Sequence, residues 1–158
     1  MSQTITLDAG ELHYDPAIHP ELYEGVRTRR AFAFLIDFSV IVFLMVAAYV
    51  VIAIVGIFTL GLLWLLLPAV WPVVAILYSV LTLGGPSSAT PGMRFMGIEM
   101  RNLRGEPIYY GLALLHVLGF WVSVAILTPL ILLVALFTSR KQLLHDLILG
   151  TVAVRSLR

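Results

Sequence analysis

Long apolar runs separated by short polar stretches organise this chain of 158 residues. The apolar runs cover about residues 31–57, 62–83 and 111–138. An α-helix needs about 20 residues to cross roughly 30 Å of hydrocarbon, and each run reaches that length. Because backbone in hydrocarbon must form its hydrogen bonds internally, the pattern predicts an all-α membrane protein with a small transmembrane helical bundle.

The polar stretches predict smaller elements. Thr90-Pro91-Gly92 has the N-cap threonine and the first-position proline of a helix start. Residues 98–101 alternate apolar and charged side chains before a glycine-containing turn, which predicts a short amphipathic hairpin at the membrane surface. In the tail, residues 143–149 predict an interfacial helix that ends at Gly150, and residues 151–154 predict a strand. The connector and the tail therefore predict a small surface β element.

The third apolar run leaves two topologies open. Its roughly 27 residues are ample for one span but too few for two full ones. One span would place the basic C-terminal residues outside, against the positive-inside rule. If the chain doubles back near Thr128-Pro129 as a shallow hairpin, all basic residues share one side with Arg30, and residues 151–154 can pair with residues 98–101. We favour the hairpin.

Residues 1–26 form a polar N-terminal segment ahead of a transmembrane domain over residues 27–158. The segment suits either a small hairpin or a flexible tail. The basic cluster Arg27, Arg29 and Arg30 beside the first apolar run predicts a cytoplasmic N-terminus. We expect an uncleaved anchor rather than a signal peptide, since acidic residues precede the first basic residue.

Composition supports the membrane assignment. Hydrophobic residues make up 60% of the chain and charged residues 12%, against roughly 45–50% and 25% in globular domains. The mean hydropathy is +0.99. The absence of cysteine excludes disulfides, thiol catalysis and cysteine-ligated zinc. We expect a multi-pass integral protein of the cell membrane, in contact with the lipid bilayer.

Three motifs resemble the RDD family of small integral membrane proteins. They are Arg30-x-x-Ala33-x-x-Ile36-Asp37, Thr90-Pro91-Gly92-Met93-Arg94-x-x-Gly97 and Leu144-His145-Asp146-x-x-x-Gly150-Thr151-Val152. The resemblance covers about residues 27–155. The family takes its name from one arginine and two aspartates, which the match places at Arg30, Asp37 and Asp146. It implies a membrane protein linked to transport in some members and to membrane assembly in others.

Two positions depart from the pattern of the family. Met93 stands where lysine is usual, and His116 stands where many members have an arginine early in the third apolar run.

Arg30, Ala33 and Asp37 share one narrow stripe of the first helix, since a helix turns about 100° per residue. The stripe must face protein rather than lipid, because it carries two charges. Arg30 and Asp37 are two turns apart, about 10 Å along the axis, which is too far for a good direct contact. We expect each to bond a group on another segment.

We predict one buried polar cluster of Arg30, Asp37 and Asp146 at the cytoplasmic membrane boundary. An unpaired buried carboxylate there would cost several kcal/mol. Two anions around one arginine leave a negative charge, so Arg94 or His116 is the expected fourth member. A carboxylate packed against arginine stays ionised and acts as a clamp, whereas one alone in an apolar site can carry a proton. We favour the clamp over an ion or proton site.

We expect no enzyme, cofactor or metal site. The sequence has no Ser/His/Asp arrangement, Walker loop or dinucleotide fingerprint, and its basic residues are too scattered for a nucleic-acid-binding face. The adjacent pair His145-Asp146 invites a metal or phosphohydrolase interpretation. We disfavour it because His13, His19 and His116 show no ligand spacing.

Two function classes stay open. The first is a small ion or solute transporter, or a transporter subunit, that uses the Arg/Asp cluster. It would work as a homo-oligomer, because so short a chain cannot enclose a pathway alone. The second is a non-catalytic membrane scaffold or assembly factor that recruits a partner protein.

Overall fold

The computed structural model describes residues 18–102, 104–137 and 142–156. The helices and strands follow the chain in the order η1 Pro20–Tyr23, α2 Val26–Phe58, η2 Leu62–Leu66, α3 Leu67–Leu83, α4 Pro91–Phe95, β1 Ile98–Asn102, α5 Tyr110–Phe137, α6 Leu144–Leu149 and β2 Thr151–Arg155. The predicted helical membrane fold with a small β element is confirmed. Residues 1–17, the larger part of the segment expected to form a hairpin or a tail, lie outside the described residues, and η1 follows them.

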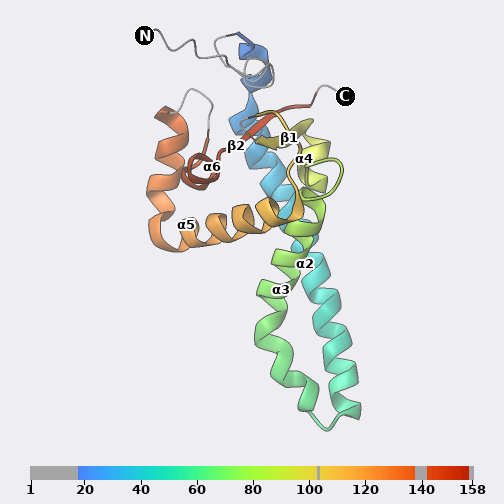
Figure 1. Cartoon of the computed structure of the whole chain (residues 1–158). Coiled ribbons are helices and arrows are strands. Elements are labelled where there is room, and N and C mark those ends of the chain that lie inside the picture. Colours follow the sequence, from blue (N-terminus) through green and yellow to red (C-terminus); the bar gives the residue numbers. More distant parts are fainter. Residues whose placement is uncertain (1–17, 103, 138–141, 157–158) are drawn as a thin grey trace.

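Helices α2 and α3 form an apolar hairpin that extends away from the rest of the molecule (Figure 1). Both helical segments are long and apolar enough to cross a membrane, judged by length and composition. Large apolar side chains lie on their outer surface and at the turn between them, where Phe58 is 83% and Leu60 is 98% exposed. Such exposure suits a lipid environment, because apolar side chains are more stable against lipid tails than against water.

The third apolar run forms the single helix α5, which changes direction partway along its length (Figure 1). The chain then returns through α6 to β2. Strand β2 packs beside η1, the element that precedes α2, and Arg155 lies 3.9 Å from the carboxylate of Glu24. The last strand therefore lies beside the start of the first long helix, as the doubling-back topology requires.

Strands β1 and β2 form a two-stranded antiparallel sheet, with Ile98 opposite Arg155 and Asn102 opposite Thr151. The pairing of residues 98–101 with residues 151–154 is confirmed. The connector hairpin is reduced to one isolated bridge between Arg101 and Pro107. A proline cannot donate a ladder hydrogen bond, which explains why no second strand continues from it.

The packed core lies at the sheet, away from the turn that joins α2 to α3. One buried cluster joins the start of α2, the end of α3, the sheet and the start of α5, and its members are Val26, Leu83, Met100, Ile108, Ala113 and Ala153. A second joins η1 to β2 through Leu22, Tyr23, Val152 and Val154. This core holds the polar side chains of α2, α4 and α6 close to one another.

Candidate functional site

Arg30 and Asp146 form a buried ion pair between α2 and α6. The Arg30 Nη1 atom lies 2.7 Å from Asp146 Oδ2, and the side chain of Asp146 is completely buried. The backbone N–H of Leu143 donates to the same oxygen at 3.0 Å, so Asp146 also caps the start of its own helix. The same carboxylate oxygen therefore pairs with the Arg30 guanidinium and accepts a hydrogen bond from the backbone at the start of α6.

The other oxygen of Asp146 faces two histidines and a hydroxyl. Asp146 Oδ1 lies 3.4 Å from His116 Nδ1 and 3.5 Å from His145 Nε2. The Thr151 hydroxyl donates to it at 3.4 Å. The fold therefore brings His116 of α5 to the His145-Asp146 pair of α6, although the three residues have no ligand spacing along the chain.

Helix α6 lies outside the two helical segments that could cross a membrane, and its ionisable groups respond to burial and to Arg30. Burial, the largest single effect, would raise the pKa of Asp146, but the Arg30 guanidinium and the two neighbouring histidines together outweigh burial and hold the pKa of that carboxyl below its usual value. Burial lowers the pKa of His145. At neutral pH the cluster therefore contains an ionised Asp146 and an uncharged His145.

Asp37 lies in a second polar group, between α2, α3 and α4. The Tyr78 hydroxyl and the Gly92 backbone N–H donate to Asp37 Oδ1 at 2.7 and 2.8 Å, and the Thr90 hydroxyl donates to Oδ2. The Thr90 oxygen also accepts from the backbone N–H of Met93 at 3.2 Å, which confirms the predicted helix start. We call Asp37, Tyr78, Thr90 and Gly92 the Asp37 group.

Gly92 allows α4 to approach α2 closely enough for these bonds. A Cβ atom at Gly92 would lie 2.3 Å from the carbonyl oxygen of Ala33 and 2.8 Å from the carboxylate of Asp37. Ala33 is itself small and 2% exposed. The first two motifs of the sequence therefore meet face to face at these small residues.

The single cluster expected from the sequence is divided in two. Arg30 and Asp146 are joined, with His116 as a further member. Asp37 does not bond Arg30, since among the described residues its donors are the three other members of the Asp37 group. The expectation that Arg30 and Asp37 each bond another segment agrees with these contacts.

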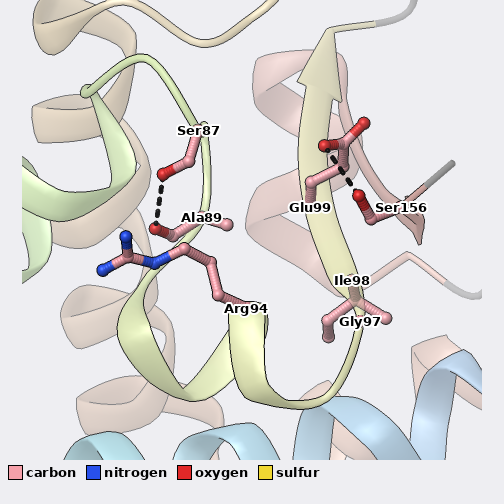
Figure 2. Close-up of a pocket in the computed structure, with 7 residues that line it drawn as sticks. All are labelled: Ser87, Ala89, Arg94, Gly97, Ile98, Glu99 and Ser156. Carbon is pink, nitrogen blue, oxygen red and sulfur yellow. Dashed lines mark hydrogen bonds between the residues drawn. The ribbon is translucent and has the colours of Figure 1, made fainter. Parts of the chain in front are cut away.

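Arg94 joins neither group through a side-chain hydrogen bond to a described residue. It is exposed and lines a pocket of about 250 Å³ between the connector and β1. Figure 2 shows its guanidinium reaching toward the segment with Ser87 and Ala89, away from Glu99. The pocket is small, and two of its polar side chains bond each other, since the Ser156 hydroxyl donates to Glu99 at 3.4 Å.

Sequence reasoning missed the partners of Asp37. Tyr78 stands in an apolar run, where its ring suggests packing, and Thr90 carries the separate signal of an N-cap. A hydroxyl inside an apolar run was the available signal, because a buried hydroxyl needs a hydrogen-bond partner. His145 was considered as a metal ligand and disfavoured, since its nearness to His116 arises only through folding.

Comparisons with known proteins agree with the motifs. No curated protein and no solved structure matches the chain. The model of the RDD family matches residues 25–150, a range that contains Arg30, Asp37 and Asp146. The chain belongs to the RDD family of membrane proteins.

Proposed function

We propose that the chain is a small ion-coupled transporter, or a subunit of one, in which Asp37 carries the coupling proton or monovalent cation. The observation that carries the proposal is the environment of Asp37. This carboxylate belongs to a helix that could cross a membrane, it is partly exposed, and it forms no ion pair with any described residue. A carboxylate without a countercharge at such a site is unfavourable, and a bound proton or cation relieves this.

Asp146, unlike Asp37, has a positively charged partner. It is completely buried and its charge is balanced by Arg30 at 2.7 Å. Such an ion pair acts as a clamp that holds α6 against α2. The two aspartates of the family signature therefore have different roles in this proposal, and only Asp37 exchanges an ion.

The neighbours of Asp37 suit a hard cation as well as a proton. The hydroxyl oxygens of Tyr78 and Thr90 contact the carboxylate, and the carbonyl oxygen of Ala33 lies at the same junction with Gly92. Oxygen atoms are the ligands that hard cations prefer. Arg94 follows Gly92 on α4 and forms no ion pair with Asp37 among the described residues, so its positive charge can favour release of the cation.

The proposal includes a topology. The cluster Arg27, Arg29 and Arg30 supports a cytoplasmic N-terminus in the cell membrane, and the position of β2 beside η1 supports a C-terminus on the same side. A two-helix hairpin cannot enclose a pathway alone, so copies of the chain would supply the remaining wall. The proposal assigns no catalytic activity.

The test uses purified protein in proteoliposomes with a pH-sensitive dye under imposed proton and sodium gradients. We expect gradient-driven flux from the wild type and its loss in Asp37→Asn. The matched control is Glu106→Gln, which removes an exposed carboxylate and should keep wild-type flux. Size-exclusion chromatography establishes that each variant is folded.

A wild type without flux would contradict the proposal and favour a membrane scaffold or assembly factor. Undiminished flux in a folded Asp37→Asn variant would leave transport in place but remove Asp37 as its site.

A further inference from the structure

The imidazole of His145 is buried without a hydrogen bond. His145 is 2% exposed, and among the described residues neither of its ring nitrogens has a hydrogen-bond partner. Native structures rarely leave a buried polar side chain in this state, so an orphaned group calls for an explanation. An uncharged imidazole nitrogen carries a lone pair, and a metal ion is one group that would use it.

Two further potential metal ligands, His116 and Asp146, lie beside His145. His116, His145 and Asp146 can supply one ligand atom each, and these atoms all lie within 4.8 Å of one another. All three residues are buried. They come from α5 and α6, two helices that pack against each other.

Two of the three separations between the ligand atoms match a tetrahedral ion. Zinc binds histidine nitrogen and carboxylate oxygen at about 2.0–2.2 Å, which places neighbouring ligands of a tetrahedron about 3.4 Å apart. The separations from Asp146 Oδ1 are 3.4 Å to His116 Nδ1 and 3.5 Å to His145 Nε2. All three ligand atoms lie within 4.8 Å of one another, so the two imidazole rings would move closer together to share one ion.

We propose that His116, His145 and Asp146 bind one divalent transition-metal ion, with Zn²⁺ as the best match. Imidazole with one carboxylate is a ligand set that suits zinc and its neighbours rather than magnesium or calcium. The fourth position falls to the Thr151 hydroxyl, 3.4 Å from both His116 Nδ1 and Asp146 Oδ1, or to a water molecule.

The surroundings supply the support that metal ligands need. Asp146 divides its oxygens, with Oδ2 held by Arg30 and the backbone of Leu143 and Oδ1 turned to the histidines. The ring of Phe120 packs edge-on against His145, with centroids 5.6 Å apart, and provides an apolar wall. The charge of Arg30 weakens metal affinity, so we expect a reversible site that ties α5 to α6 rather than a permanent one.

This inference does not depend on transport by Asp37. The metal site lies on α5 and α6, whereas the Asp37 group joins α2, α3 and α4. Bound metal would fix α6, and with it the carboxylate that pairs with Arg30.

The experiment uses the full chain in detergent, stripped of metal with a chelator and dialysed against Zn²⁺. We expect one zinc ion per chain by inductively coupled plasma mass spectrometry. We also expect the visible absorption bands of tetrahedral Co²⁺ when cobalt replaces zinc. His116→Gln and His145→Gln should each lower zinc affinity by at least about tenfold, the range that even indirect changes around a metal produce. His19→Gln is the matched control, because His19 bonds Glu21 far along the chain from this site.

The cobalt spectrum of the wild type needs no variant, so the test stands even if a histidine variant fails to fold. Absence of stoichiometric zinc and of tetrahedral cobalt bands in the wild type would overturn the proposal. So would unchanged affinity in both folded variants, or an equal loss in His19→Gln.

Discussion

The Arg30 guanidinium holds a carboxylate that has no access to solvent. Because Asp146 is completely buried, its charge depends on Arg30 and on the backbone N–H of Leu143 for stabilisation. Asp37 instead keeps partial exposure and is held by two hydroxyls and an amide. The two aspartates therefore differ in how much they depend on Arg30: loss of Arg30 would leave the charge of Asp146 unpaired, whereas the partners of Asp37 would remain.

A double-mutant cycle separates the two aspartates. Arg30→Gln should destabilise the protein by about 3–5 kcal/mol, because it leaves Asp146 charged, buried and unpaired. Combined with Asp146→Asn it should show a coupling of about 1–3 kcal/mol, since the two residues are in contact. Combined with Asp37→Asn it should be additive to within about 0.5 kcal/mol. Unfolding by SDS in mixed micelles measures all variants, and strong coupling between Arg30 and Asp37 would refute the division into two groups.

The sequence identified these residues as polar groups that need partners, but it could not identify each partner. Counting charges predicted a single cluster, because arginine and aspartate attract each other at short distances. A count of charges cannot identify neutral donors such as the hydroxyl of Tyr78. Their role depends on which faces of α2 and α3 meet, and only packing determines that.

One stripe of α2 contacts three different elements. Arg30 reaches α6, Ala33 receives Gly92 of α4, and Asp37 bonds Tyr78 of α3 as well as the start of α4. The short helix α4 has too few residues to be stable alone. Its place depends on this contact with α2.

Replacing Gly92 with alanine tests the contact. Alanine favours a helix over glycine by up to about 1 kcal/mol, but its Cβ would overlap the carbonyl oxygen of Ala33 at 2.3 Å. Backbone overlap of this kind costs about 1–3 kcal/mol, so we expect a net loss of stability. Thermal unfolding followed by size-exclusion chromatography measures it.

Gly111→Ala is the control, because its new Cβ would meet the far end of the Tyr109 side chain at 3.0 Å, which can move aside. We expect wild-type or slightly higher stability there. Equal stability of Gly92→Ala and the wild type would show that α4 does not need the close approach.

The turn of the apolar hairpin and the packed core lie at opposite ends of the molecule (Figure 1). Helix α2 has 33 residues, or about 50 Å at 1.5 Å per residue, which exceeds the roughly 30 Å of hydrocarbon. Its basic first turns can therefore stand outside the hydrocarbon while its apolar remainder crosses it. The sheet, α4 and the start of α2 would then share one membrane surface.

Single cysteines give a direct test, because the natural chain has none. Glu24→Cys and Arg104→Cys should react with a membrane-impermeant maleimide only in inverted vesicles, and Leu60→Cys only in intact cells. Glu24 has a side chain 79% exposed and Leu60 is 98% exposed, so access is not limited by packing. Labelling of Glu24→Cys and Leu60→Cys from the same side would contradict a spanning hairpin.

Prediction from the sequence was most complete for the elements and their pairing. Apolar run lengths predicted the long helices, and the β-branched tail predicted the partner of β1. The doubling back of the third apolar run stays a prediction, because a run of about 27 residues suits either one membrane span or a shallow hairpin. The pairing of β1 with β2 brings the C-terminal strand beside the connector that follows α4.

The Arg30 ion pair joins positions 116 residues apart in the chain, and this separation has a consequence during synthesis. A ribosome adds about 5–20 residues per second, so α2 waits roughly 6–23 seconds for the carboxylate of Asp146 to emerge. During that interval the arginine must use lipid phosphates or water in place of its final partner. Chains that end before α6 would keep Arg30 without its carboxylate partner, so they would lack the ion pair that holds α6 against α2.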